Sequence, residues 1–139
     1  MEKLKNKIFI HLGLICFIFL LVISCSEKDY QIELVSQEEM EDLILADSIQ
    51  LIDVRSFEEF QNKHIKGAQS IVFDEEFEEN IQKLDKSKPV AVYCRTGRRS
   101  KECSQYLKEK GFTKIYDLEG GLAKWEYNDL IIENQNSIQ

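Results

Sequence analysis

The chain has 139 residues, which allows one domain, and its formal net charge is −7. An acidic chain without a basic stripe argues against nucleic-acid binding, because no row of cations remains to neutralise phosphates. The sequence has no Cys-x-x-Cys pair and no histidine cluster, so we expect neither a metal site nor a cofactor.

Residues 1–24 have the pattern of a secretory signal. Three lysines against one glutamate form a basic start within the first seven residues, and an apolar run over 8–23 follows. This run is shorter than the roughly 20 residues that cross a bilayer as a helix. We therefore expect the segment to direct export and not to contribute to the fold.

The end of the apolar run resembles a bacterial lipobox. Val22, Ile23 and Ser24 precede Cys25, and the chain becomes polar directly afterwards. In proteins with this signal, cleavage occurs before the cysteine, which then receives a lipid. The resemblance implies an exported protein of the bacterial cell envelope, anchored to a membrane through Cys25. Ile23 is larger than the usual residue, and an uncleaved signal anchor or a signal peptide without lipid are the alternatives.

The next part of the chain alternates strands with short helices. A β-prone run over 32–35 precedes Ser-Gln-Glu-Glu at 36–39, a capping box that begins a helix. A buried-type strand over 51–54 leads to a second capping box, Ser-Phe-Glu-Glu at 56–59. A glycine turn then introduces a third strand over 70–72.

The same alternation continues to the end of the domain. Apolar residues at helical spacing predict a helix over 73–84, and a fourth strand follows over 90–93. A helix over 99–110 ends at a glycine, which is typical of a C-cap. The last strand covers 114–118, and a Gly-Gly turn leads into a final short helix.

Five strands separated by helices predict an α/β fold, with a five-stranded, mostly parallel sheet flanked by helices on both faces. The predicted organisation is a signal over 1–24, a tether over 25–30, one domain over 31–132 and a flexible tail over 133–139.

Cys94 is the candidate for the chemistry of this chain. It follows the fourth strand directly, and open α/β sheets bind ligands at the carboxyl ends of their parallel strands. The loop over 95–99 leads into a helix N-terminus, whose free N–H groups favour an anion. Gly97 lets this loop curl into a nest, and three arginines add positive charge. A thiol held there is expected to ionise readily.

The cysteines and the histidine also have other possible roles. A cysteine protease needs a Cys–His pair, but His64, the one histidine after the signal, lies in a turn-like segment without a visible relation to Cys94. A disulfide between Cys94 and Cys103 is an alternative in an exported protein, and Cys94 as a buried apolar residue is another. The arginine-rich loop favours a reactive Cys94 over both.

Four segments resemble the signatures of rhodanese domains. Residues 93–100 (YCRTGRRS) are similar to the active-site loop of that family. Residues 51–60 and 64–68 resemble its two upstream signatures, and Leu-Glu-Gly-Gly at 118–121, with the tryptophan that follows, resembles its C-terminal one. The resemblance extends over about 30–127. It implies a sulfurtransferase in which Cys94 takes sulfur from an anionic donor such as thiosulfate and passes it to cyanide or a thiol.

The same resemblance assigns further roles. The loop around the thiolate and the anionic donor is formed by Arg95, Thr96, Gly97, Arg98 and Arg99. The framework around the second strand is formed by Asp53, Arg55, Glu59 and His64, for which a surface ion-pair cluster is the alternative. Cys103 is expected to be a packed core thiol, with a role in resolving a persulfide as the alternative.

Two rival functions remain open on the sequence. Dual-specificity phosphatases and arsenate reductases of related fold need an arginine after five residues that follow the cysteine, but Ser100 occupies that position here. The other rival is a non-catalytic rhodanese module for sulfur sensing or protein binding. Inactive members typically lack the cysteine, whereas Cys94 is present with its whole loop.

Overall fold

The computed structural model describes residues 30–133. The predicted signal, Cys25 and most of the predicted tether therefore lie outside the described residues, as do residues 134–139 of the predicted tail.

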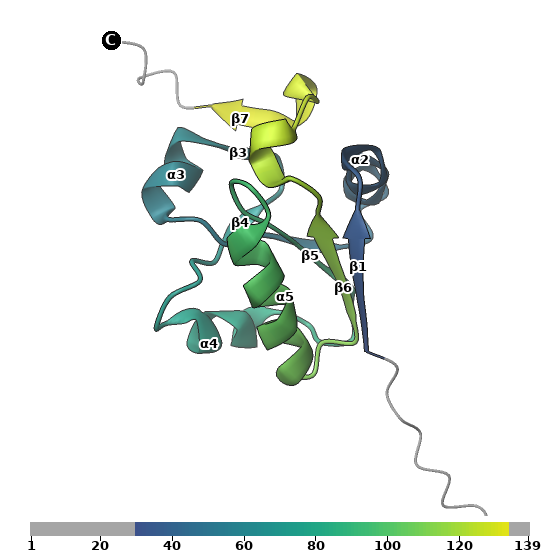
Figure 1. Cartoon of the computed structure of the whole chain (residues 1–139), viewed down its shortest axis with the longest axis vertical. Coiled ribbons are helices and arrows are strands. Elements are labelled where there is room, and N and C mark those ends of the chain that lie inside the picture. The colour runs from purple at the N-terminus through teal and green to yellow at the C-terminus, as the bar shows by residue number, and fades with distance from the viewer. Residues whose placement is uncertain (1–29, 134–139) are drawn as a thin grey trace, which may run out of the picture.

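The centre of the molecule is one parallel five-stranded sheet, so the predicted fold class is confirmed (Figure 1). Its order is β1-β6-β5-β2-β4, with parallel pairing throughout. The strands are β1 (Gln31–Val35), β2 (Gln50–Asp53), β4 (Gln69–Ser70), β5 (Val90–Tyr93) and β6 (Lys114–Leu118). Because β5 is the middle strand, the residue that follows it lies at the centre of the carboxyl edge of the sheet.

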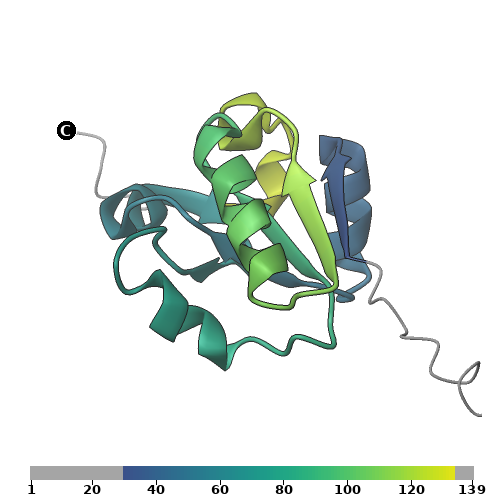
Figure 2. The same ribbon diagram turned by 60° about the horizontal axis from the view of Figure 1, so that its bottom comes forward.

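Helices cover both faces of this sheet, as predicted (Figure 2). One apolar layer lies under the longest helix, α5, together with α4 and η1. The layer on the opposite face lies under α2 and the C-terminal segments. The helical elements are α2 (Gln37–Leu45), α3 (Phe57–Asn62), α4 (Phe77–Asn80), η1 (Ile81–Lys83), α5 (Arg98–Glu109), η2 (Gly121–Lys124) and η3 (Asn128–Leu130).

Both predicted capping boxes are present. The Ser36 hydroxyl accepts the backbone N–H of Glu39 at 3.2 Å, and the Glu39 carboxylate accepts the Ser36 N–H at 2.8 Å. Ser56 and Glu59 repeat this exchange at 3.2 Å in each direction. These side chains satisfy amides that a helix start leaves without partners, which fixes the beginnings of α2 and α3.

Two predicted boundaries are wrong in the third quarter of the chain. The continuous helix expected over 73–84 is only the short α4 followed by the 3-10 turn η1. Asp74 prevents an earlier start, because its carboxylate accepts the N–H of Glu76 at 3.0 Å and so forms a turn. The third strand is Gln69–Ser70, not 70–72, and beyond it the N–H groups of Ile71 and Phe73 donate to the Asp53 and Val54 carbonyl oxygens at 3.0 and 3.3 Å.

A second, antiparallel sheet was not predicted. It pairs β3 (Lys63–Ile65) with β7 (Ile131–Glu133), and the ion pair from Lys63 to Glu133 joins their ends at 2.9 Å. His64 is therefore a strand residue, where a turn was expected. The ordered strand also includes Glu133, one residue beyond the predicted domain end. Each strand has only three residues, which is too few to give a readable alternation.

Across residues 30–133, no helix has the length and apolar character that a membrane crossing requires.

Candidate active site

Cys94 lies where β5 ends, at the centre of the carboxyl edge of the sheet. Its residue is almost fully buried, with 1% of its surface exposed. Gly97 adopts a φ of 91°, which lets the backbone reverse direction directly before α5 begins at Arg98. The Gly97 N–H then donates to Cys94 Sγ at 3.2 Å. The loop is thus wrapped around the sulfur, with backbone donors pointing inward.

This loop makes the thiol more acidic. Burial by itself raises the pKa of Cys94, but the backbone N–H groups of Ser100, Thr96 and Gly97, together with the Ser100 hydroxyl, lower it below its ordinary value. The first turn of α5 supplies some of these donors, since its amides have no partners within the helix. The arrangement favours a thiolate without help from a histidine.

The segment η2 is joined to the loop by two backbone hydrogen bonds. The N–H groups of Leu122 and Ala123 donate to the carbonyl oxygens of Cys94 and Arg95, both at 2.9 Å. Gly121 permits this contact, because a Cβ there would lie only 2.5 Å from the Cys94 carbonyl oxygen. The sequence predicted the Gly-Gly pair as a turn and, through the family resemblance, as part of a signature. The structure gives its physical role, which is close approach of two backbones.

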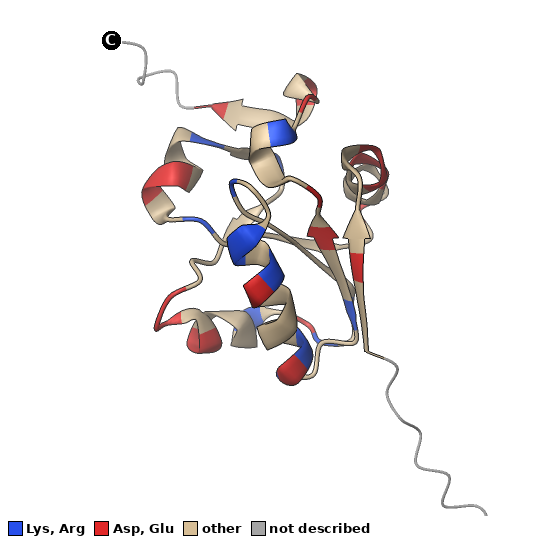
Figure 3. Cartoon of the chain, in the orientation of Figure 1, with Lys and Arg blue, Asp and Glu red and all other residues tan. Residues whose placement is uncertain are grey.

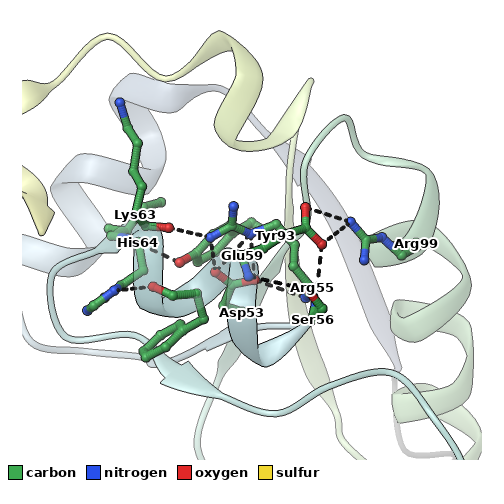
Figure 4. Close-up of polar contacts among 10 residues, drawn as sticks. Asp53, Arg55, Ser56, Glu59, Lys63, His64, Tyr93 and Arg99 are labelled. Atoms are coloured by element: carbon green, nitrogen blue, oxygen red, sulfur yellow. Dashed lines mark hydrogen bonds and ion pairs between the residues drawn. The ribbon is translucent and has the colours of Figure 1, made fainter. Parts of the chain in front are cut away.

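Asp53 and Arg55 form a buried ion pair at the end of β2, beside Tyr93 of β5 (Figure 4). The Arg55 Nη2 donates to Asp53 Oδ2 at 2.6 Å, and the Arg55 Nε reaches both carboxylate oxygens at 2.9 and 3.0 Å. Arg55 also donates to the backbone carbonyl of Lys63. The pair therefore joins the end of β2 to β3, and it is not a surface cluster.

Arg99, which the sequence grouped with the substrate-binding residues, forms an ion pair with Glu59 (Figure 4). Its Nη2 donates to Glu59 at 3.0 Å and 3.2 Å, one distance to each carboxylate oxygen. Partial burial raises the pKa of Glu59, but the Ser56 N–H and the Arg99 guanidinium hold it below its ordinary value. Arg99 thus joins the start of α5 to the capping box of α3.

Arg95, Thr96 and Arg98 remain at the surface around the buried sulfur. Positive side chains gather at this loop and along the start of α5, whereas α4 and α2 carry acidic ones (Figure 3). Arg95 also lines an open groove of about 490 Å³ beside the loop, together with Lys63 and Trp125. An anion approaching this acidic protein would therefore meet its basic charge at the mouth of the site.

The His64 side chain contacts Phe60, four residues earlier in the chain. Its ring stacks on Phe60 with 3.9 Å between centroids, and its Nδ1 lies 2.7 Å from the Phe60 carbonyl oxygen. Cys103 is free, as is Cys94, and no part of its surface is exposed. The disulfide considered on the sequence is thus not formed. Burial raises the pKa of the Cys103 thiol well above its ordinary value, so it behaves as a core side chain.

Within residues 30–133 no group of histidine, cysteine and carboxylate side chains has the arrangement of a metal site.

The chain is similar in sequence to known proteins. A family model described as a rhodanese-like domain matches residues 36–128. The chain is 38% identical over 80 residues to a thiosulfate sulfurtransferase GlpE of Shewanella oneidensis, a match that covers 58% of this chain and 78% of that protein. It is 35% identical over 92 residues to a thiosulfate sulfurtransferase GlpE of Coxiella burnetii, with 66% and 85% covered. An uncharacterized protein of Bacillus subtilis, YqhL, is 41% identical over 76 residues, which cover 55% of this chain and 60% of YqhL.

Solved structures of rhodanese-like proteins are similar to this chain in fold. A rhodanese-like domain protein of Staphylococcus aureus superposes with a TM-score of 0.65 at 26% identity, covering 73% of this chain and 99% of that one. A rhodanese-related protein of Thermoplasma volcanium superposes with a TM-score of 0.60 at 27% identity, covering 67% and 89%.

Proposed function

Because this chain belongs to the family of rhodanese-like domains, we propose that it is a sulfurtransferase in which Cys94 carries sulfur as a persulfide. The observation that supports this most directly is the state of the Cys94 thiol. It is surrounded by backbone N–H groups that lower its pKa although burial opposes ionisation. A thiolate is the nucleophile that sulfur transfer requires.

The reaction proceeds in two displacements. The Cys94 thiolate attacks the outer sulfur of thiosulfate, a new S–S bond forms, and the bond to the sulfonate sulfur breaks so that sulfite leaves with the electron pair. An acceptor, cyanide or a thiolate, then attacks the outer sulfur of the persulfide, and the Cys94 thiolate leaves. The N–H groups of Thr96, Gly97 and Ser100 that stabilise the thiolate are placed to stabilise the negative persulfide in the same way.

Exposed arginines supply donor binding in this proposal. The donor is an anion and the chain is acidic, so a local basic field is needed to attract it. Arg95 and Arg98 are exposed on the loop that encloses Cys94, and guanidinium groups suit oxyanions. Arg99 acts instead through its ion pair with Glu59.

The engagement of Arg99 also argues against a phosphatase. Such a reaction needs an arginine that closes the loop around a tetrahedral oxyanion, whereas Ser100 stands at that position and Arg99 is paired with Glu59. A non-catalytic module is less consistent with a thiol whose pKa is held low.

We also propose that the domain is exported and anchored in the bacterial cell envelope through a lipid on Cys25. The basis is the sequence pattern of residues 1–25. In cell fractionation, the wild-type chain should sediment with membranes, and Cys25→Ala should be released or remain uncleaved. A wild-type chain that is wholly soluble would contradict the anchor, and it would leave the sulfurtransferase assignment intact.

Intact mass spectrometry tests the persulfide. After incubation with thiosulfate the protein should gain the mass of one sulfur atom, and cyanide should remove it with release of thiocyanate. Cys94→Ser should gain no sulfur, while Cys103→Ser should gain it as the wild type does. A wild-type protein that never gains sulfur from thiosulfate or from another sulfane donor would refute the proposal.

A further inference from the structure

A group of buried polar side chains lies beneath the active-site loop, on the side of the sheet that α5 covers. Asp117, on β6, has 4% of its surface exposed. Ser100 and Ser104 face this layer from α5, with 0% and 1% exposed. The displacement steps proposed for Cys94 use no side-chain atom of these three residues. A carboxyl group buried this deeply is costly unless it is paired or protonated.

Asp117 is incompletely satisfied. Its Oδ1 has no hydrogen-bond partner among residues 30–133, and neither does the Ser104 hydroxyl. The titratable groups around it are Lys101 and Cys103 on α5, and its register partner in β5 is Val92, which carries no charge. On its other side, its register partner in β1 is Leu34, which carries no charge. One exposed lysine is thus the only cation near this carboxyl group in the described part of the chain.

This environment moves the titration of Asp117 toward neutral pH. Burial raises the pKa of its carboxyl group to about 6, although the hydroxyls of Ser100 and Ser104 and the charge of Lys101 act in the opposite direction. Asp117 therefore changes its charge within the pH range in which a thiol enzyme operates.

Ser100 connects this carboxyl group to the reactive sulfur. Its N–H and its hydroxyl both lower the pKa of Cys94, and the same hydroxyl lowers the pKa of Asp117. The hydroxyl has a single proton, which it donates in this structure to the Gly97 carbonyl oxygen at 3.2 Å. A thiolate and a carboxylate therefore compete for one donor.

We propose that Asp117 is a positioning residue that controls, through Ser100, the hydrogen bonding of the Cys94 sulfur. When Asp117 is protonated, its O–H donates to Ser100 Oγ, and the Ser100 proton is free to point at the thiolate or persulfide. When Asp117 is ionised, it accepts the Ser100 proton and withdraws it from the sulfur. No covalent bond changes, and the proton that Asp117 gains or loses is exchanged with solvent.

This inference rests on the proposed role of Cys94, and it adds a pH response that the loop alone does not give. As pH rises through the titration of Asp117, the thiolate loses the Ser100 hydroxyl as a donor. The titration of Cys94 should therefore be spread over a wider pH range than that of a single thiol, as expected for two coupled groups. An asparagine at 117 donates N–H at every pH and should remove this coupling.

The test is the rate of Cys94 alkylation by iodoacetamide between pH 5 and 10, on the full chain, with peptide mapping to separate Cys94 from the other cysteines. Wild type should give a broadened curve. Asp117→Asn should give a single, steeper titration whose midpoint is lower by roughly half a pH unit, equivalent to about three-fold more thiolate below the midpoint. Ser104→Ala is the matched control, because Ser104 faces Asp117 without affecting Cys94, and its curve should keep the wild-type breadth.

A double-mutant cycle isolates the path through Ser100. Asp117→Asn should shift the midpoint of the alkylation curve when it is made in wild type. Made in the Ser100→Ala variant, it should shift the midpoint by less than half of that amount. A full-sized change would overturn the proposal, as would an Asp117→Asn curve that matches wild type. Alkylation needs no sulfur donor, so these outcomes are independent of persulfide formation. Should Ser100→Ala fail to fold, the single variants at 117 and 104 still decide whether Asp117 governs the titration.

Discussion

Cys94 and Cys103 lie in the same apolar layer under α5, and both are almost completely buried. Their thiols nevertheless differ, because the pKa of Cys94 is lowered and that of Cys103 is raised well above its ordinary value. Burial is the largest influence on each and opposes ionisation in both. The difference therefore arises from the backbone around them.

The position of each cysteine relative to α5 explains the contrast. Cys94 precedes the helix, where the amides of the loop and first turn are free to point at its sulfur. Cys103 lies within the helix, where the amides are already used by the α-helical ladder, and the charges that act on it are those of Asp117 and Cys94. Nine residues of sequence thus separate a thiol held among N–H donors from a core side chain. What distinguishes them is the availability of oriented N–H donors.

The largest expected effect comes from exchanging sulfur for oxygen at the two positions. Cys94→Ser should lower thiosulfate:cyanide sulfur transfer by at least roughly 10³-fold, because a hydroxyl cannot carry a persulfide. Cys103→Ser should stay within about three-fold of wild type, since that thiol does not reach substrate. Thiocyanate release by the purified variants measures both. An active Cys94→Ser together with an inactive Cys103→Ser would reverse the assignment.

The next effect tests whether the oriented backbone is the cause. Gly121→Ala would place a Cβ 2.5 Å from the Cys94 carbonyl oxygen and push the loop out of place. We expect kcat to fall on the order of 10²-fold, the usual result of misplacing a reacting group by about 1 Å.

Gly67→Ala is the matched control for this variant. Gly67 also has a positive φ, 84° against 62° for Gly121, but a Cβ there would meet nothing within 4 Å. Both variants place a residue with a Cβ at a positive φ, and this strain should lower the free energy of unfolding in urea by about 1–2 kcal/mol. Only Gly121→Ala should also displace the loop around Cys94. Equal losses of kcat in the two would show that strain, and not loop position, matters.

Much of this contrast could be predicted from the sequence. The apolar run before Cys94 and the Gly97 turn after it indicate a strand end and a helix start, which are local features set by near neighbours. The parallel sheet followed from the alternation of strands and helices, and that conclusion did not require the order of the strands within the sheet. Local signals were sufficient for the fold class and for the position of Cys94 between a strand end and a helix start.

Long-range partners could not be predicted in this way. Arg99 was grouped with the substrate-binding residues because of its place in the loop, but its partner Glu59 lies 40 residues earlier in the chain. Asp117 was interpreted only as part of a strand, although a carboxylate between Tyr116 and Leu118 was a signal that a charge enters the core. The β3–β7 pairing depends on contacts of the same long range. Such partners are fixed by the packed fold, and a local pattern does not contain them.

A smaller effect separates the arginines. Arg98→Ala should raise the KM for thiosulfate by roughly ten-fold with kcat nearly unchanged, as expected for loss of one charged contact of about 1.5 kcal/mol. Arg99→Ala breaks a partly exposed ion pair with Glu59. It should therefore lower kcat and reduce the free energy of unfolding by about 0.2–1 kcal/mol. Steady-state kinetics and urea unfolding measure these quantities. An Arg98→Ala variant with unchanged KM and reduced kcat would make Arg98 part of the loop framework.

The last effect concerns stability and not activity, and it tests the charge that distinguishes the surroundings of Cys103. The Asp117 carboxyl has a folded-state pKa of about 6, above its unfolded value, so its native state is favoured when the proton is present. The bound proton contributes fully to the free energy of unfolding below about pH 4, and this contribution is lost as pH rises toward and through 6. The loss is at most roughly 3 kcal/mol. Asp117→Asn should therefore unfold at a higher urea concentration than wild type at pH 7.5, because the amide cannot ionise. At pH 4 the two proteins should unfold at nearly the same urea concentration.

Asp129→Asn is the control, because it removes the same charge from an exposed position on η3. It should show no such pH-dependent gain in stability. Equal behaviour of the two variants would mean that Asp117 is not a buried charge at neutral pH, and it would remove the physical basis for its action on Ser100.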